Sequence, residues 1–250
     1  MLFRSWIWLN GGDGETWTRV PESTQNARPF YLSWSPTSSA TREMVALPLV
    51  DFTDDAFPDV VECQNGVIGP ESSVPALAEA AAGGLIPRVA ALAAAARAAG
   101  VKVVHCVAMI HPDGWGANRN ARLFGVARRS KMKQVPGSAA VEPVAEIGVV
   151  EGSDVVVARF HGLSPTSGTE LDIMLRNEGI ATVVVAGVSL NLAVPNTVFD
   201  LVNGGFQVVV PTDAVIGTPV AYGEMVLEHT LSYVATLTDV ETLAGAWSAS

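Results

Sequence analysis

The chain has 250 residues, 49% of them hydrophobic and 16% charged, which is enough apolar material for one large domain with a core on both sides of a sheet. Its formal net charge is −10 and its pI is about 4.8, which argues against nucleic acid or an anionic membrane surface as the main partner. No apolar stretch reaches about 18 residues without charges or helix breakers, so no segment is expected to span a membrane.

The first 45 residues differ in composition from the remainder of the chain. Four of the six tryptophans lie here, among glycine, serine, threonine, proline and asparagine, without any sustained period: Trp6, Trp8, Trp17 and Trp34. We predict a poorly ordered extension over 1–45, with Met44 a candidate for the native start, followed by one α/β domain over 46–250. The alternative is an arm that packs on a partner subunit through its tryptophans.

Apolar strands alternate with helices from Phe57 onwards. Strands are predicted at 57–67, 101–110, 153–160, 180–187 and 206–214, and helical segments at 74–100, 169–179 and 219–234. The first helical region should break near Gly83–Gly84 and restart at Pro87, and Thr169 should cap the second. The strands are nearly continuous runs of valine, isoleucine and alanine, which is typical of burial on both faces. This order predicts a three-layer α/β sandwich with a mostly parallel sheet.

Ligands of such sheets bind beyond the carboxyl ends of the strands, which directs attention to Glu62, His105, Arg159, Ser189 and Asp213. Glu62 follows its strand directly, so a partly shielded carboxylate could act as a general acid or base. The alternative for Glu62 is a simple ion pair. Arg159 could hold Glu62 ionised or stabilise negative charge on a substrate, or it could clamp a carboxylate without catalysis.

The segment "GVSLNLAV" at 187–194 offers its backbone for binding. A helix that begins near Leu192 or Ala193 points free amide donors outward, where an oxyanion or carboxylate can bind. Alanine at this place can bind or polarise a substrate but cannot attack it. We assign substrate binding to a set of residues at the strand ends and in the following loops: Gln64, Arg119, His161, Ser189 and Leu192.

Six basic residues crowd into 119–133, either as a solvated helix face or as a cationic lip over a pocket for a small carboxylate. Cys63 and Cys106 lie in apolar strand-like runs and are predicted to be core residues rather than nucleophiles. The cysteine pattern shows neither a disulfide framework nor a zinc spacing, which favours a reducing, cytoplasmic setting. His105 and His111 have only a loose spacing for a metal, so we expect neither a metal nor a cofactor.

Two stretches carry a resemblance to a known family: "VVECQNGVIG" at 60–69 and "GTELDIMLRNEGI…VVVAGVSLN…DLVNGGFQVVVPTDA" within 168–214. Over about residues 57–240 the chain resembles the isochorismatase-like hydrolases, often labelled cysteine hydrolases. The resemblance implies a six-stranded parallel sheet and a homo-oligomer. Most members hydrolyse amides through an acyl-enzyme with an aspartate, a lysine and a cysteine, whose positions Glu62, Arg159 and Ala193 occupy here. A thiol acyl-enzyme is therefore ruled out at that position.

Some members need no cysteine, because they cleave a vinyl ether by protonating the alkene carbon. Glu62 would be that acid here, although Arg159 close by would oppose the raised pKa that the acid needs. Three functions are consistent with the sequence. The chain is a cysteine-independent hydrolase of a small, anionic molecule; or an amidase in which Glu62 activates water; or a catalytically inactive binding protein of the same fold.

Overall fold

The computed structural model describes residues 6–11, 14–19, 56–130 and 132–248, and the chain divides into two units, Met1–Pro48 and Leu49–Ser250. The described part of the first unit is an antiparallel pair of strands, β1 (Trp6–Gly11) and β2 (Gly14–Arg19). The sequence predicts no regular element here, so this strand pair is new. Most of the predicted extension over 1–45, with its possible tryptophan arm, lies outside the described residues and stays a prediction.

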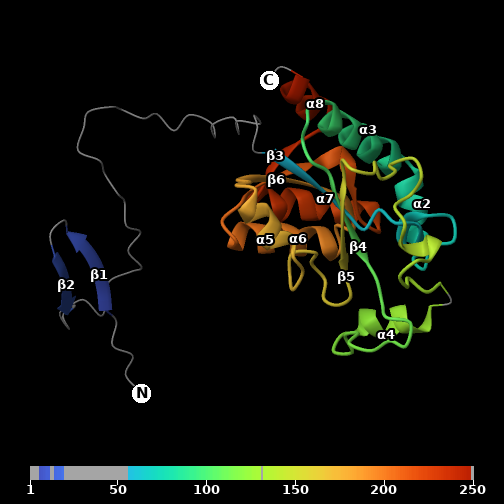
Figure 1. Ribbon diagram of the computed structural model, residues 1–250, viewed down its shortest axis with the longest axis horizontal. Helices are drawn as coiled ribbons and strands as arrows, with labels where there is room; N and C mark the ends of the chain where they lie inside the picture. Colours follow the sequence, from blue (N-terminus) through green and yellow to red (C-terminus); the bar gives the residue numbers. More distant parts are fainter. Residues whose placement is uncertain (1–5, 12–13, 20–55, 131, 249–250) are drawn as a thin grey trace. The chain divides into compact units, whose positions relative to one another are not determined.

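The second unit alternates strands and helices in the order that the sequence predicts (Figure 1). Its elements are β3 (Ala56–Val61), α1 (Asn65–Ile68), α2 (Pro75–Ala82), α3 (Leu85–Ala98), β4 (Val104–Ala108), α4 (Arg122–Arg129), η2 (Ala139–Val141), β5 (Val155–Arg159), α5 (Leu171–Asn177), β6 (Thr182–Val188), α6 (Ala193–Asn203), β7 (Gln207–Pro211), η3 (Thr212–Ala214), β8 (Val215–Ile216), α7 (Val220–His229), η4 (Leu231–Tyr233), β9 (Thr236–Thr238) and α8 (Val240–Ser248).

The central sheet is parallel throughout its described pairs. Six strands follow the order β5-β4-β3-β6-β7-β9, and the short β8 pairs with β6. The chain builds outward from β3 to β5 on one side and then from β6 to β9 on the other. Neighbouring β3 and β6 therefore mark the place where the winding direction reverses, and a crevice opens there beyond the strand ends. The predicted three-layer α/β sandwich with a mostly parallel sheet is confirmed.

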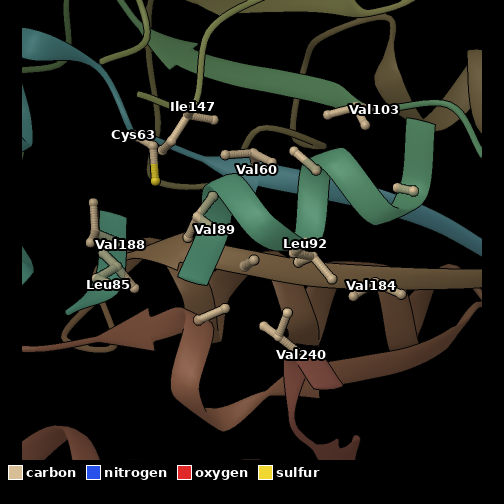
Figure 2. Packing of buried hydrophobic residues seen from close by; sticks show 14 of the residues in the cluster. Val60, Cys63, Leu85, Val89, Leu92, Val103, Ile147, Val184, Val188 and Val240 are labelled. Atoms are coloured by element: carbon tan, nitrogen blue, oxygen red, sulfur yellow. The ribbon is translucent and has the colours of Figure 1, made fainter. Parts of the chain in front are cut away.

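Helices cover both faces of the sheet, and each face has its own apolar core (Figure 1). One core joins α2, α3 and α8 to the sheet, and Figure 2 shows Val89 and Leu92 of α3 beside Val60 and Val184. The other core joins α5, α6 and α7 to the opposite face, where Val61 and Val185 lie. Valines alternate between the two cores along a strand, which explains why the strands are apolar at nearly every position.

Several boundaries differ from those predicted. Helix α3 begins at Leu85, two residues before Pro87, because Gly84 adopts a φ of 151° and already turns the chain there. Helix α5 has Glu170 at its N-cap position, while Thr169 accepts a hydrogen bond from the Leu171 amide at 3.2 Å. The last predicted helix ends at His229. Strands β8 and β9 were not predicted because they have only two or three residues, and helix α8 was not predicted either.

No single helix in the described part of the chain is long and apolar enough to cross a membrane. Helices α2 and α3 reach that length and composition only together, as a pair bent by 63°.

Candidate active site

The ends of β3, β4, β5 and β6 surround a cavity of about 320 Å³ at the crevice between β3 and β6. Glu62 follows β3, Ala108 ends β4, Arg159 ends β5, and the turn from Ser189 to Ala193 connects β6 to α6. All of these residues except Leu190 of the turn line the cavity. Residues far apart in the sequence thus meet because parallel strands present their carboxyl ends at the same edge of a sheet.

Glu62 has an unusual backbone conformation, with a φ of 50°. This left-handed conformation is rare for residues other than glycine and costs about 1–3 kcal/mol. Its amide donates to the Cys106 carbonyl at 2.8 Å, and neighbouring Gly187 gives the space, since a Cβ there would lie 2.2 Å from the Val61 carbonyl oxygen. The fold therefore holds Glu62 in an unfavourable backbone state that the surrounding strands impose, and such residues cluster at functional sites.

Glu62 and Arg159 form an ion pair inside the cavity. The Nη2 group of Arg159 donates to Oε1 of Glu62, and Nη1 donates to the Gly162 carbonyl at 2.7 Å. Both side chains are largely buried, at 15% exposure for Glu62 and 12% for Arg159. Burial lowers the pKa of Arg159 to about 10, so the guanidinium keeps its charge at neutral pH. The cavity thus contains a largely buried carboxyl group in direct contact with a guanidinium.

The turn between β6 and α6 presents backbone donors to the cavity. Two amides in the turn already have acceptors: Leu190 donates to the Ile216 carbonyl and Leu192 donates to the Ser189 carbonyl. Ala193 is the first residue of α6, so its amide has no acceptor within the helix. Among the amides that the sequence pointed to, that of Ala193 is thus the best placed to bind an oxygen of a substrate.

Asn191 fixes this turn through its side chain. Its Nδ2 donates to the Thr218 carbonyl at 2.7 Å, and its Oδ1 accepts from the Thr218 amide at 2.9 Å. The Asn191 side chain therefore pairs with both backbone groups of Thr218, as a neighbouring strand would, and connects the start of α6 to the segment before α7. Asn191 was not predicted as a site residue, and its local signal is only a polar residue within an otherwise apolar turn.

The predicted binding residues occupy two kinds of position. Ser189, Leu192 and His161 line the cavity. Gln64 does not, because its fully buried side chain already donates to the Ala108 carbonyl and accepts from the Ala108 amide. Arg119 is exposed and lies outside the lining, whereas Asn118 beside it is a lining residue that accepts from the Gly162 amide at 2.8 Å. Gln64 and Arg119 are thus not among the lining residues, and their role in substrate binding stays a prediction.

The outer wall of the cavity is apolar rather than cationic. Leu123, Phe124 and Ala127 of α4 line it together with Met132, while Arg122 and Arg129 of the same helix are exposed and do not. The predicted cationic lip is therefore not formed by these arginines, which belong to the solvated face of α4. The sequence did not predict these wall residues as site residues. They come from the short helix α4 and the loop after it, and they form no recognisable motif.

Neither cysteine lies at the cavity. Cys63 and Cys106 are buried in the two separate cores, and burial raises the pKa of the Cys63 thiol to about 12. The Cys106 thiol donates to Oδ1 of buried Asp59 at 2.8 Å, and burial followed by the Asp59 charge raises its pKa well above the usual value. Thiols that stay protonated and buried are poor nucleophiles.

The remaining polar candidates have structural partners. His105 contacts Asp154 through Nε2 at 3.0 Å, and Asp154 also accepts two hydrogen bonds from Arg97, so the three form a buried network. Asp213 accepts from the Val240 amide at 3.0 Å. Among the residues that the structure describes, no group of three or more histidine, cysteine, aspartate or glutamate side chains is arranged to hold a metal ion.

Comparison with known proteins identifies a matching family. The chain matches the model of the Isochorismatase domain over residues 60–242. It is 27% identical over 188 residues to the uncharacterized isochorismatase family protein YecD of Escherichia coli O157:H7, a match that covers 75% of this chain and 93% of YecD. It is also 40% identical over 73 residues to the uncharacterized isochorismatase family protein YwoC of Bacillus subtilis (strain 168), covering 29% of this chain and 38% of YwoC.

Solved structures share the fold. An isochorismatase family protein from Desulfovibrio vulgaris subsp. vulgaris str. Hildenborough superposes with a TM-score of 0.68 and 26% identity, covering 78% of this chain and 98% of its own. A cysteine hydrolase from Pseudomonas syringae pv. phaseolicola 1448A has a TM-score of 0.70 and 20% identity, covering 84% of this chain and 99% of its own. The similarity to both thus extends over almost the whole of the compared proteins.

Proposed function

The chain belongs to the isochorismatase family, and we propose that it is a hydrolase that dispenses with a thiol and uses Glu62 as a general base. One observation carries the proposal. Glu62, Arg159 and Ala193 line the same cavity, whereas neither Cys63 nor Cys106 is a lining residue. Such a site has a group that can accept a proton and a donor that can bind an oxyanion. It lacks a side chain that could form an acyl-enzyme at the start of α6.

The ion pair favours a base over an acid. A general acid must hold a proton at working pH, whereas the Arg159 cation beside Glu62 favours the ionised carboxylate. Within the described part of the chain, the hydrogen bond of the Glu62 side chain involves Oε1. The second oxygen, Oε2, can then accept a proton from water. This argues for hydrolysis at a carbonyl carbon and against protonation of a vinyl ether.

The proposed reaction is the hydrolysis of a C–N bond in a small amide or carbamoyl compound. Water attacks the carbonyl carbon while Glu62 takes one of its protons, and the carbonyl oxygen becomes an oxyanion that accepts a hydrogen bond from the Ala193 amide. When the tetrahedral intermediate collapses, the C–N bond breaks and the leaving nitrogen takes the proton back from Glu62. The products are an acid and an amine, and Glu62 is regenerated in its ionised form.

The test is turnover by the purified protein on short amides, carbamoyl compounds and isochorismate. We expect hydrolysis of a C–N bond by the wild type and a loss of at least about 100-fold in Glu62→Gln, because general base catalysis contributes about that much. Glutamine still accepts from Arg159, so the fold should persist, which circular dichroism checks. Glu178→Gln, on the exposed end of α5, is the matched control and should keep full activity.

Two results would contradict the proposal. Turnover that survives in Glu62→Gln would show that another group activates water. Absence of turnover on every compound, with ligands bound equally by the wild type and Glu62→Gln, would favour the catalytically inactive binding protein instead.

A further inference from the structure

Gln134 is a cavity-lining residue in the loop between α4 and η2, and its position is fixed from several sides. Its backbone carbonyl accepts from the Ile110 amide at 2.8 Å, which holds the loop against the segment that follows β4. Its Cγ packs over Gly66, where an added Cβ would lie only 2.9 Å away. A larger residue at Gly66 would therefore displace Gln134, and the glycine keeps this place open.

The buried Gln64 determines which way the amide of Gln134 points. The backbone amide of Ala108 can only donate, so the side-chain atom of Gln64 that receives its hydrogen bond at 2.7 Å must be Oε1. The other atom of that amide is then Nε2, a donor whose acceptors are Gln134 at 2.7 Å, the Ala108 carbonyl at 2.9 Å and, at a longer 3.3 Å, the Ala140 carbonyl. The atom of Gln134 that accepts this bond must be its Oε1.

Within the part of the chain that the structure describes, Oε1 carries the side-chain hydrogen bond of this lining residue, so its Nε2 group retains two hydrogens to donate. The wall around it is apolar, with Leu123, Phe124 and Met132 among the lining residues. Polar groups that lose water without gaining a partner cost about 1–3 kcal/mol. A ligand that fills this cavity and displaces water must therefore offer a hydrogen-bond acceptor to Gln134, or it leaves the Gln134 donors unpaired.

We propose that Gln134 is a substrate-binding residue, held in its donating orientation by Gln64, and that it selects small molecules with an apolar body and a carbonyl or carboxylate oxygen. Gln64 is then a positioning residue, which reconciles its expected importance with its lack of contact to the cavity. The inference rests on the proposed function in taking this cavity as the substrate site. It replaces the expectation of a mainly anionic substrate by one in which apolar surface supplies most of the affinity.

The test measures binding by calorimetry with three probes: acetamide, phenylacetamide and 2-phenylethylamine. In the wild type, phenylacetamide should bind at least about tenfold more tightly than acetamide, because the phenyl ring enters the apolar wall. Gln134→Leu should weaken phenylacetamide about tenfold, which corresponds to one lost hydrogen bond. Gln207→Leu removes a glutamine that is exposed at the start of β7, and this control should change nothing.

Gln134→Glu gives a sharper comparison, because a carboxylate keeps the acceptor for Gln64 but replaces the Nε2 donor with a second acceptor. We expect it to weaken phenylacetamide and to strengthen 2-phenylethylamine, whose ammonium group donates, each by about tenfold. Opposite shifts of two probes of the same shape cannot come from a general loss of folding.

The inference is overturned if phenylacetamide does not bind, if it binds no better than acetamide, or if Gln134→Leu leaves its affinity unchanged. Binding needs no turnover, so the two proposals can fail separately. If the protein is inactive but binds phenylacetamide in a way that depends on Gln134, the proposed hydrolase activity is wrong and the proposed ligand class stands. If it turns over substrate equally well with and without Gln134, the hydrolase activity stands and the proposed role of Gln134 is wrong.

Discussion

Asp59 is a carboxyl group inside the apolar core, and it should make the stability of the protein depend on pH. It lies in the middle of β3, opposite Val104 on β4 and Val185 on β6, and it is 1% exposed. The Cys106 thiol donates to its Oδ1, whereas its Oδ2 is buried without a hydrogen-bond partner. Burial raises the pKa of Asp59 from 3.8 to about 7, and the hydrogen bond from Cys106 offsets only a part of this.

The sign and size of the effect follow from the two pKa values. The unfolded chain releases the Asp59 proton near pH 3.8, while the folded chain keeps it to about pH 7, so stability falls as pH rises between these values. A difference of about three in pKa corresponds to about 4 kcal/mol, of which about 3 kcal/mol should be lost between pH 5 and pH 8. Above the folded pKa the loss is complete and constant.

The perturbation is Asp59→Asn, which removes the titration at nearly constant volume. The new amide is partly unpaired and costs about 1–3 kcal/mol, but at every pH alike. Relative to the wild type, the variant should therefore gain about 3 kcal/mol in free energy of unfolding from pH 5 to pH 8, as measured by urea denaturation. The difference between the two proteins isolates Asp59, because groups such as His105, whose pKa burial lowers, titrate in both.

Asp172→Asn is the control for the loss of one carboxylate, since Asp172 pairs with Arg176 on the exposed face of α5. It should change stability by less than about 1 kcal/mol at either pH. Parallel pH profiles for the wild type and Asp59→Asn would refute the reasoning, because they would mean that Asp59 is equally easy to ionise in the folded and unfolded chains.

Two further predictions concern stability. The side chain of Asp154 is fully buried and, although burial opposes it, hydrogen bonds from Arg97, Val150 and His105 lower its pKa to about 2. Asp154→Asn should remove the ion-pair partner of Arg97 and cost about 3–5 kcal/mol in urea denaturation, whereas a cost below about 1 kcal/mol would show that the ion pair is dispensable. Gly187→Val should prevent the normal approach of β6 to β3, since a Cβ would lie 2.2 Å from the Val61 carbonyl oxygen and φ is 107°; we expect little soluble, folded protein on expression, and a variant with the wild-type melting temperature would contradict this.

Much of the fold could be predicted because burial on both faces leaves a direct trace in the sequence. The run "TVVVAGV" at 182–188 is buried at every position, and its apolar character alone indicates a central strand. Strand β9, by contrast, has three half-buried residues with two threonines, a pattern that is common in loops. Its place at the edge of the sheet depends on pairing with β7, which local sequence does not encode.

The candidate site could be predicted where strand ends determine it. Glu62, Arg159 and Ala193 lie at the ends or starts of elements, so their convergence follows from the parallel sheet. Gln64 and Gln134 show the limit, because which glutamine is buried and which faces the cavity depends on a hydrogen-bond network across about 70 residues. The homo-oligomer and the cytoplasmic setting stay predictions.

Asp59 was missed for a different reason. Asp59 is visible in the sequence as a charged residue in an apolar strand. Because it lies only three residues before Glu62, it is easily taken as part of the polar end of that strand. The structure separates them, since Asp59 faces the core with Val61 while Glu62 lies in the cavity.

The order of the strands divides the reactive groups between two contiguous halves of the chain. Glu62 and Arg159 both belong to the half that forms β3, β4 and β5, and Ala193 belongs to the half that begins with β6. The ladder between β3 and β6 joins the halves through six partner pairs, from Ala56 with Thr182 to Val61 with Gly187. The register between β3 and β6 thus sets the distance from the Glu62–Arg159 ion pair to the Ala193 amide. A shift of this register by one residue would displace the two groups relative to each other by about 3.3 Å. Variation in β7 and β9, which carry none of these three groups, can alter stability while leaving the spacing between β3 and β6 intact.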